Sequence, residues 1–509
     1  MRVFLINYSR PMEIDIARRL RAGGVEIAYW LGAKEYYQKL VAAGEFSGTV
    51  FHSTYDAING APAPGIDPAQ FPPADKQLIE ELGPYESAVL DMMEGFDHFH
   101  MPLLKKQHLY YTYLRYWQGV LKTFKPDAVL FADIPHTPYN FVIYHLARKN
   151  NIKTVLYKHT KGIVGRLLFF EDFTDYRELQ AAYASLLKQG FRLDNLSAEL
   201  RTYYAKHRDP QADNTLYYRK TKYLVDKAKQ SDILPRWSTI VRHLRQLTLW
   251  STTYKYLRMM FIKVRLIRFE RQFTFVWQER ILQYRRNRIK KRFHAEFKGL
   301  VEDNPDLAQK FVYVPLHFQP ECATNPQGNI FKDQILMLET LSYALPPGWV
   351  IYAKENEIQW SWPRGYLGRY PGYYQTVAAN KNIRLISPRI STFTLMEKAQ
   401  AVATVTGTAG WEAVMRGTPA LLFGHTWYNG AEGVFTVSGV ADCRSVFEKI
   451  ARGYAIDQGK VVTFLGALQQ VAVAGYPSKR YKGDSAITES ESARNISEKI
   501  LHILGPHVS

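Results

Sequence analysis

The chain has 509 residues and a formal net charge of +19, and 46% of its residues are hydrophobic and 14% aromatic. This length exceeds what a single hydrophobic core organises, so we expect two domains, and the apolar content excludes an intrinsically disordered protein. The only two cysteines are Cys322 and Cys443. A disulfide framework is therefore excluded, and a reducing, cytoplasmic environment is expected.

The N-terminal residues predict a strand. Residues 1–7 form a short apolar run that polar residues follow at once, which is too short for a signal peptide. No window of about 18 uncharged apolar residues occurs, so no transmembrane helix is expected.

The positive charge is concentrated in one segment. Residues 242–292 contain 15 Lys/Arg against 2 Asp/Glu, interleaved with large apolar side chains. This pattern favours helices that lie on an anionic membrane surface, whereas a helical linker with a solvated basic face is the plainer alternative. Nucleic acid is not an expected partner, because no nucleic-acid-binding motif accompanies the charge. The candidate membrane contacts are Arg285, Arg286, Arg288, Lys290, Lys291 and Arg292.

The first part of the chain predicts a doubly wound α/β domain. Strands are expected at 3–6, 25–30, 128–133 and 152–157, helices at 12–22, 78–124 and 139–149, and a loop at 45–77. Asp133 ends the third of these strands, and His136 lies in the turn after it. Ligands bind at the carboxyl ends of strands in such sheets, so both residues are candidates for a site.

Strand patterns fade between residues 174 and 300, where 176–206 and much of 238–297 predict helices, and then return. Strands are expected at 311–315, 349–353, 382–386, 401–405 and 418–423, and helices at 332–343, 392–399, 411–416 and 492–504. The expected fold is α/β, with two Rossmann-like, doubly wound domains and a basic helical insertion between them. The predicted divisions are 1–173, 174–300, 301–485 and a C-terminal helix at 486–509, which could pack back across the domain boundary.

Residues 401–424 read as a strand, a glycine loop, a helix and a further strand. Gly407 and Gly410 let the backbone come close to a ligand. The following helix begins with unpaired amides and a partial positive charge, so an anion such as phosphate suits this position. Thr406 and Thr408 add hydroxyl groups. A tight turn without a ligand fits the same pattern.

Four loops follow predicted strands of the second domain, at 317–321, 354–357, 387–389 and 406–410. The carboxyl ends of parallel strands share one edge of a sheet, so these loops are expected to lie together. They offer a cation, Lys354, together with carboxylates, hydroxyls and amides. A phosphate next to a ribose would suit this set.

These motifs resemble the bacterial capsule polysaccharide biosynthesis family, which includes Kdo transferases of capsule and lipopolysaccharide assembly. The resemblance rests on residues 315–321, 350–355, 385–388, 406–412, 417–424 and 427–428, and more loosely on residues 125–170. It implies a metal-independent GT-B glycosyltransferase with no cofactor. The C-terminal domain would bind a nucleotide sugar, and the N-terminal domain would bind the acceptor.

The resemblance also implies roles for individual residues. The nucleotide or its phosphates would be bound by Lys354, Glu355, Asn356, Ser387, Thr406, Gly407, Thr408, Gly410 and Glu412. The candidate catalytic residues are Asp133, first as general base or nucleophile, then His136, His317 and Glu321. Relatives that use CMP-sugars carry Lys-x-His-Pro where this chain has Lys354-Glu-Asn-Glu357. Asn356 and Glu357 therefore leave open whether the donor is a CMP-sugar.

The expected function is transfer of a sugar, Kdo or another ulosonic acid among the candidates, onto a glycan or lipid-linked acceptor of a bacterial surface polysaccharide. The expected location is the inner face of the cytoplasmic membrane, as a peripheral protein. One alternative is a sugar-nucleotide epimerase or hydrolase on the same scaffold. Another is a non-catalytic subunit of a polysaccharide export assembly. No cluster of His, Cys or acidic residues has metal-ligand spacing, so no metal is expected.

Overall fold

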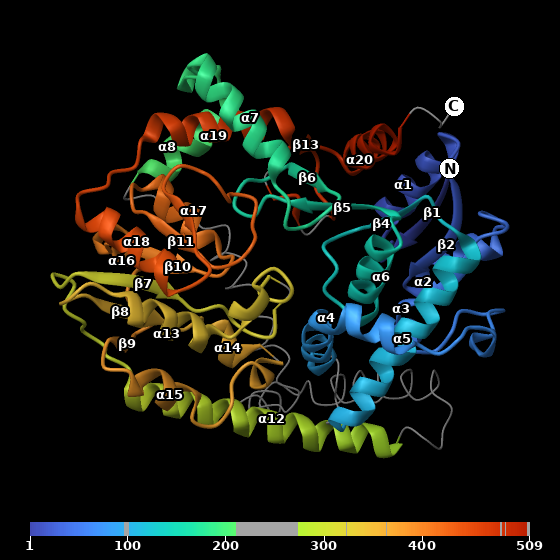
Figure 1. The fold of residues 1–509 in the computed structure, drawn as a ribbon, viewed down its shortest axis with the longest axis horizontal. Coiled ribbons are helices and arrows are strands. Elements are labelled where there is room, and N and C mark those ends of the chain that lie inside the picture. The colour runs from blue at the N-terminus through green and yellow to red at the C-terminus, as the bar shows by residue number, and fades with distance from the viewer. Residues whose placement is uncertain are drawn as a thin grey trace, which may run out of the picture.

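The structure is a computed structural model that describes residues 1–95, 101–209, 273–321, 323–362, 364–478, 481–483 and 485–505. Two mainly parallel sheets, each flanked by helices, lie side by side (Figure 1). This is the predicted GT-B-like α/β class with two Rossmann-like domains, so the predicted fold class is confirmed. No helix in these described ranges is long and apolar enough to cross a membrane.

The N-terminal sheet has the strand order β13-β6-β5-β4-β1-β2-β3. Its strands are β1 (Arg2–Ile6), β2 (Glu26–Gly32), β3 (Val50–Ser53), β4 (Ala128–Phe131), β5 (Lys153–His159), β6 (Arg166–Phe170) and β13 (Val473–Ala474). Strands β1 to β5 pair in parallel, and β6 and β13 add antiparallel pairs at one edge. The chain order reverses between β1 and β4, which makes their carboxyl ends the place where a ligand is expected.

Helices cover both faces of this sheet. They are α1 (Pro11–Ala22), α2 (Lys34–Ala42), α3 (Thr54–Ile58), the short η1 (Pro68–Gln70), α4 (Lys76–Glu94), α5 (Leu103–Phe124) and α6 (Pro138–Lys149). Proline occupies the first helical position of α1 and α6, where its fixed φ fits and no amide hydrogen is needed. The prediction of a continuous loop at 45–77 is wrong. The short apolar stretch at Val50 and Phe51 pairs with β2 as an edge strand, and Ser53 caps α3.

The C-terminal sheet has the order β12-β11-β10-β7-β8-β9, and all its pairs are parallel. Its strands are β7 (Phe311–Pro315), β8 (Val350–Lys354), β9 (Ile383–Ile386), β10 (Ala401–Thr404), β11 (Ala420–Leu422) and β12 (Val434–Thr436). The four predicted loops follow β7, β8, β9 and β10, which are adjacent strands of this sheet. Their expected placement along one edge is therefore confirmed.

The helices of this domain are η3 (Asn329–Lys332), α13 (Gln334–Ala344), α14 (Ile358–Ser361), η4 (Gly365–Leu367), α15 (Tyr373–Ala379), α16 (Thr392–Lys398), α17 (Thr408–Met415), α18 (Val440–Ala451) and α19 (Gln458–Val471). Helix α17 begins at Thr408, three residues earlier than predicted, because the small residues Thr408, Ala409 and Gly410 form its first turn rather than a loop. It ends before Gly417, whose φ of 93° is the left-handed conformation expected of a glycine after a helix.

Segments outside the two sheets connect the domains. Helices α7 (Arg177–Gln189), η2 (Leu193–Asn195) and α8 (Ala198–Arg208) pack on α17 and α19. After α19 the chain returns to the first sheet through β13, and α20 (Glu489–Leu504) packs on α1, as expected of the last helix. Helix α12 (Phe273–Leu300) runs along one edge of the molecule beside α15 (Figure 1).

Candidate functional site

The imidazole of His317 contacts the turn that starts α17. Its Nε2 is 3.1 Å from the Thr404 hydroxyl and accepts a hydrogen bond from the Thr406 amide at 3.4 Å. The Thr404 hydroxyl also accepts a hydrogen bond from the Gly407 amide at 3.1 Å. Because Nε2 is an acceptor, the ring proton is assigned to Nδ1. The imidazole thus supports the backbone at the N-terminal end of α17.

The two glycines of the turn are required by close contacts. A Cβ on Gly407 would lie 2.7 Å from the Thr404 hydroxyl and 3.3 Å from the His317 ring, and a Cβ on Gly410 would lie 2.8 Å from the Tyr428 hydroxyl. Gly407 is the N-cap of α17 in an extended conformation. Amides of the first turn of a helix lack partners within the helix and carry a partial positive charge, so an anion can bind at this end.

The hydroxyl groups predicted for this turn differ in their surroundings. Thr406 is buried, and its hydroxyl donates to the main-chain oxygen of Ala323 at 2.8 Å, so it fixes the loop after β7. Thr408 is half-buried in the first turn of α17. It contacts Glu412, whose pKa is raised because burial outweighs the opposing contributions of Thr408 and Arg416. Glu412 therefore lies one turn into α17, beside Thr408, the first residue of the helix.

Glu321 connects His317 to the other domain. Its carboxylate lies 3.8 Å from His317 Nδ1 and 3.8 Å from the Lys161 amine. Burial would raise its pKa, but His317, Lys161 and Lys158 together lower it, so the group is ionised. Lys158 also donates a hydrogen bond to the Gln327 side chain. Two lysines from the end of β5 thus lie beside the loop after β7.

Lys354 supports a neighbouring loop. Its amine donates to the Ile390 carbonyl at 2.6 Å and to the Thr392 hydroxyl at 2.9 Å, and burial lowers its pKa to about 8. Ser387, also buried, begins this loop, and its main-chain oxygen accepts from the Ile390 amide at 3.2 Å. Lys354 is therefore hydrogen-bonded to the loop after β9, and it brings positive charge to this part of the sheet edge.

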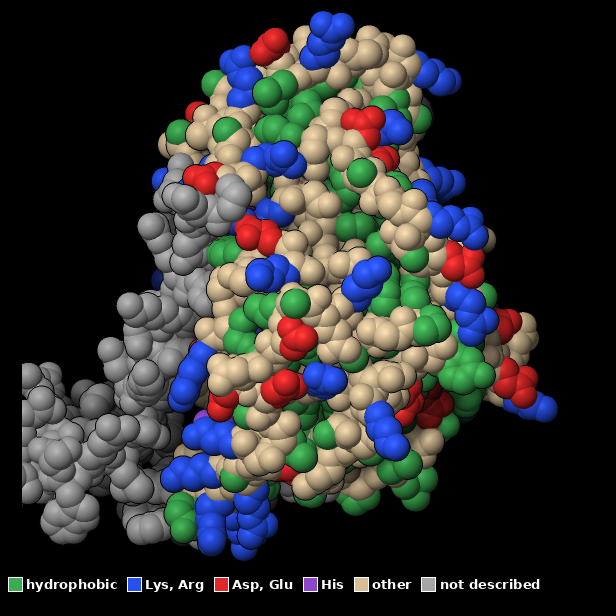
Figure 2. All heavy atoms as spheres, turned by 90° about the vertical axis from the view of Figure 1, so that its left-hand side faces the viewer, with side chains coloured by type: hydrophobic (Ala, Val, Ile, Leu, Met, Phe, Trp, Pro, Cys, Tyr) green, Lys and Arg blue, Asp and Glu red, His purple; other side chains and the backbone are tan. Residues whose placement is uncertain are grey.

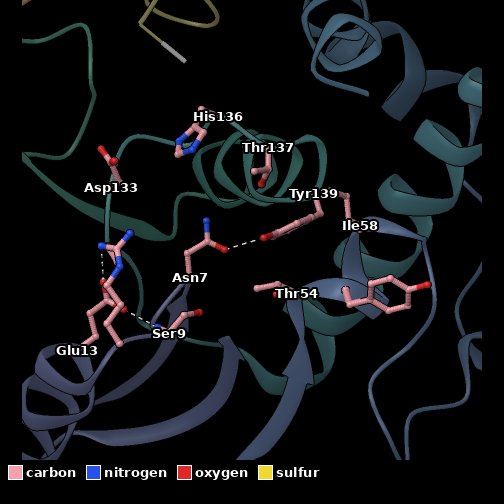
Figure 3. A pocket seen from close by; sticks show the side chains of 12 residues that line it. Asn7, Ser9, Glu13, Thr54, Ile58, Asp133, His136, Thr137 and Tyr139 are labelled. Atoms are coloured by element: carbon pink, nitrogen blue, oxygen red, sulfur yellow. Dashed lines mark hydrogen bonds and ion pairs between the residues drawn. The ribbon is translucent and has the colours of Figure 1, made fainter. Parts of the chain in front are cut away.

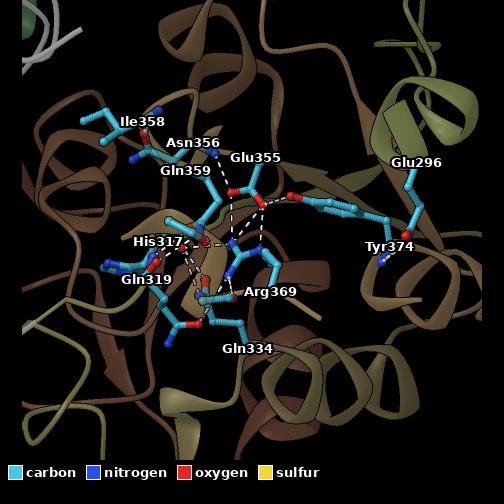
Figure 4. A network of polar contacts seen from close by, with 12 residues as sticks. Glu296, His317, Gln319, Gln334, Glu355, Asn356, Ile358, Gln359, Arg369 and Tyr374 are labelled. Atoms are coloured by element: carbon cyan, nitrogen blue, oxygen red, sulfur yellow. Dashed lines mark hydrogen bonds and ion pairs between the residues drawn. The ribbon is translucent and has the colours of Figure 1, made fainter. Parts of the chain in front are cut away.

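Glu355 and Arg369 form a fully buried ion pair (Figure 4). The guanidinium donates two hydrogen bonds of 2.9 Å to the carboxylate, which also accepts from the Tyr374 hydroxyl at 2.6 Å and the Asn356 amide at 2.7 Å. Asn356 in turn accepts from the Ile358 amide at 3.1 Å at the start of α14. Every acceptor atom of Glu355 is engaged within the protein, so the structure gives this residue a supporting position rather than a free ligand-binding carboxylate.

A pocket of about 460 Å³ lies at the carboxyl ends of β1, β3 and β4 in the N-terminal domain (Figure 3). Asp133 and His136, which were predicted as candidates, both line it, together with residues that the sequence did not single out. Those additional lining residues are Asn7, Ser9, Arg10, Glu13, Thr54, Tyr55, Ile58, Ala132, Thr137 and Tyr139. The lining is rich in hydroxyl, amide and carboxylate groups, which can bind the hydroxyls of a sugar.

The pKa values of the two carboxylates of this pocket are shifted in opposite directions. Burial would raise the pKa of Asp133, but Lys158, His136 and His159 together lower it. The pKa of Glu13 is raised to about 7, mainly because the side chain is buried. Glu13 accepts from the Ser9 amide at 2.5 Å and from Arg10 at 3.3 Å. His136 donates from Nδ1 to the Ile134 carbonyl at 2.7 Å, which leaves its Nε2 as an acceptor.

The basic residues of α12 divide between two faces. Arg285, Arg288, Lys291 and Arg292 are exposed. Arg286 and Lys290 are buried, since Arg286 lies 5.4 Å over the Tyr366 ring and Lys290 donates to the Trp362 carbonyl at 3.2 Å. The prediction that all six face a membrane is therefore wrong for Arg286 and Lys290. Figure 2 shows Lys and Arg side chains together at the lower end of the molecule, where α12 runs. The other residues predicted in the basic segment, up to 272, lie outside the described residues.

Sequence reasoning missed Glu13, Lys158, Lys161 and Arg369. Lys158 and Lys161 follow a predicted strand, so the rule that placed Asp133 at a strand end could have found them. No sequence pattern pointed to Arg369, which lies in an irregular segment. Among the described ranges no group of three or more His, Cys, Asp or Glu residues could hold a metal ion.

Several solved structures are similar to this chain at low identity. UDP-GlcNAc 2-epimerase from Neisseria meningitidis bound to UDP-GlcNAc is 14% identical, with 99% of each chain covered and a TM-score of 0.21. The β-Kdo 2,7-transferase KpsC of Thermosulfurimonas dismutans is 11% identical, with 76% of this chain and 88% of that chain covered and a TM-score of 0.31. The calicheamicin glycosyltransferase CalG4 is 12% identical, with 100% and 99% covered and a TM-score of 0.23.

No curated protein matches the chain. Residues 366–446 match the model of a family described as "Capsule polysaccharide biosynthesis protein". The matched segment includes Arg369, β9, β10, the turn at Gly407, α17 and β11. The resemblance of this chain to the bacterial capsule polysaccharide biosynthesis family is thereby confirmed.

Proposed function

We propose that the protein is a glycosyltransferase of bacterial surface polysaccharide synthesis, which moves a sugar from a nucleotide donor to a glycan or glycolipid acceptor. The observation that carries this proposal is the N-terminal end of α17, where Gly407 lies against His317 and Thr404 at the carboxyl edge of a parallel sheet. Such an end binds phosphate through amides and the helix dipole. The match of residues 366–446 to a capsule polysaccharide biosynthesis family supports the choice of polysaccharide synthesis.

The donor nucleotide would lie along the edge formed by β7, β8, β9 and β10. Its phosphate would bind at the start of α17, where the amides of Thr408 and Ala409 have no partner within the helix. Thr408 and Glu412 would bind the ribose side. Lys158 and Lys161 would add positive charge from the other domain, since both act on Glu321 below this turn.

The reaction breaks the bond between the sugar and the donor phosphate, and it forms a bond from the sugar to an acceptor oxygen. The phosphate leaves with added negative charge, which the helix end and the two lysines stabilise. The acceptor would bind in the pocket of the N-terminal domain, and its hydroxyl proton would pass to a carboxylate. Glu13 suits this role better than Asp133, because a pKa near 7 balances proton affinity against ionisation at neutral pH.

A nucleotide screen tests this proposal. Purified protein is heated with CMP, UDP, GDP, dTDP or ADP, and a nucleotide at about 100 times its dissociation constant should stabilise the fold by roughly 2.7 kcal/mol. The nucleotide that raises the melting temperature identifies the donor class, and a shift with CMP supports Kdo or another ulosonic acid. The absence of any shift would contradict the proposal and favour a non-catalytic assembly subunit.

A second experiment separates transfer from the alternative chemistry. The sugar nucleotide of the identified class is incubated with the protein, with and without oligosaccharide acceptors. A transferase consumes the donor only when an acceptor is present. Equal consumption without any acceptor would instead indicate an epimerase or hydrolase.

The exposed cations of α12 support a peripheral position at the inner face of the cytoplasmic membrane. Arg285, Arg288, Lys291, Arg292 and Lys298 are all exposed, and no acidic residue is exposed beside them on this part of the helix. Anionic lipid headgroups attract such a face by roughly 1 kcal/mol per cation. This position would keep the proposed transferase near a lipid-linked acceptor.

A further inference from the structure

Arg369 connects the buried ion pair to the turn proposed to bind phosphate. Its Nη2 donates to the main-chain oxygen of His317 at 3.1 Å as well as to Glu355. Its Nη1 donates to the Gly368 carbonyl at 2.6 Å and lies 3.3 Å from the Gln319 side-chain oxygen. With Nε on Glu355, all five N–H groups of the guanidinium have an acceptor (Figure 4). Arg369 is thus fixed in one orientation.

The main chain of His317 is held on both sides. Gln334, at the start of α13, accepts from the His317 amide at 2.6 Å and donates to the His317 carbonyl at 3.0 Å. Arg369 supplies the second donor to that carbonyl. A charged donor makes the stronger hydrogen bond of the two. The position of the His317 ring below Gly407 therefore depends on Arg369 and Gln334 together.

Helix α12 is hydrogen-bonded to the segment that follows Arg369. The Glu296 carboxylate accepts from the amides of Gly372 at 3.2 Å, Tyr374 at 2.8 Å and Gln375 at 3.3 Å, which caps the start of α15. Tyr374 then donates to Glu355. A continuous set of hydrogen bonds thus runs from α12 through Tyr374, Glu355 and Arg369 to His317.

We propose that Arg369 is a positioning residue for nucleotide binding: it fixes His317, and His317 fixes the turn at which α17 begins. The inference rests on the proposed nucleotide site and deepens it. The positions of Glu355 and Arg369, 0% exposed in their side chains, exclude direct contact with a ligand. Their effect on binding must therefore pass through His317 and Gly407.

The principal test is Arg369→Lys. A lysine keeps the positive charge next to Glu355 but cannot reach the carboxylate and the His317 carbonyl with a planar fork. We expect the dissociation constant of the nucleotide found by the thermal screen to rise about tenfold, as measured by calorimetry at a temperature where the variant is folded. In ¹⁵N spectra of histidine-labelled protein, the His317 resonances should shift toward those of a mixture of tautomers.

Two further variants separate positioning from stability. Glu355→Gln combined with Arg369→Met removes the pair without leaving a buried charge, and it should weaken nucleotide binding at least as much as Arg369→Lys. Ile450→Ala, in the buried face of α18, destabilises the same domain on a helix that carries no residue of the network and should leave the nucleotide dissociation constant unchanged.

The outcomes of these measurements are distinct. Unchanged nucleotide affinity and unchanged His317 resonances in Arg369→Lys would overturn the positioning role while leaving the proposed function intact. Equal weakening by Ile450→Ala would also overturn it, since loss of stability alone would then account for the effect. A wild-type protein that binds no nucleotide would overturn both proposals.

Discussion

The imidazole of His317 lies in contact distance below the α-carbon of Gly407, so that an added Cβ would stand 3.3 Å from its Cε1. The two residues come from loops after neighbouring strands, β7 and β10, and are 90 positions apart in the chain. The contact makes the backbone at the start of α17 dependent on the loop after β7. A glycine is needed at position 407 because of this neighbour and not because of its φ, which is −72°.

Gly407→Ala should weaken nucleotide binding. The new methyl group would meet the Thr404 hydroxyl at 2.7 Å, so the turn or the ring must move. Overpacking of this kind costs about 1–3 kcal/mol, and the displaced amides should raise the nucleotide dissociation constant about tenfold or more. Calorimetric titration measures the affinity. Gly439→Ala is the matched control, since nothing lies within 4 Å of a Cβ there; equal affinities in the two variants would contradict the prediction.

Glu355→Ala should strongly destabilise the C-terminal domain. The change leaves the Arg369 guanidinium buried without its carboxylate, and breaking a buried pair in this way costs about 3–5 kcal/mol. Urea denaturation followed by tryptophan fluorescence measures the loss. Glu26→Ala, which breaks an exposed pair with Arg2, serves as the control and should change stability little. A similar midpoint for both variants would show that the buried pair contributes no special stability.

The edge of the C-terminal sheet could be predicted because apolar runs mark its strands, and the loops after them hold small and polar residues. His317 and Gly407 were found this way. Arg369 could not be found, since it lies 14 residues after Glu355 in an irregular stretch with no periodicity. Its importance comes from a contact between distant segments.

Glu13 and the two buried cations of α12 show a second limit of prediction from the sequence. Glu13 sits in the first turn of α1, where an acid ordinarily complements the helix dipole at the surface. Here the pocket and the Ser9 amide enclose it. Arg286 and Lys290 look like the other cations in sequence, but they lie on the face that carries Phe293 and Phe297 into the core. Only tertiary packing distinguishes them.

The ionisation of Glu13 should make stability fall as pH rises. Its pKa in the folded protein is about 7, above the ordinary value of 4.5, so the folded state holds more protons between these values. Stability from this group is therefore complete below about pH 4.5 and is lost toward pH 7, by an amount on the order of 3 kcal/mol. Glu13→Gln should be more stable than the wild type at pH 8 and about equal to it at pH 5. Melting temperatures of both proteins across pH 5–8 measure this; parallel curves would contradict the assignment.

The same residue should control the rate of transfer. If Glu13 accepts the acceptor proton, the rate should rise with pH through an apparent pKa near 7, and Glu13→Gln should lose about 10²-fold or more in kcat while keeping its nucleotide affinity. Asp133→Asn is the comparison. Its carboxylate is already ionised well below neutral pH, and its charge contributes to the raised pKa of Glu13, so its loss should lower the rate and move the pH-dependent rise in rate to lower pH without abolishing it. A rise in rate near pH 7 that persists in Glu13→Gln would exclude Glu13 as the base.

Removal of the exposed charge on α12 should weaken binding to anionic membranes. The variant Arg285→Gln, Arg288→Gln, Lys291→Gln and Arg292→Gln keeps the buried Arg286 and Lys290 contacts, so the fold should be retained. Four lost cations at roughly 1 kcal/mol each predict a loss of about 10²-fold or more in affinity for phosphatidylglycerol vesicles, measured by co-sedimentation. The matched control removes four exposed cations elsewhere, Lys188, Arg201, Lys381 and Arg444. Because the attraction is screened, the wild-type affinity should also fall as salt rises. Equal binding by the two variants would show that α12 has no special role at the bilayer, and binding of the wild type to neutral phosphatidylcholine vesicles would show that charge is not what attracts it.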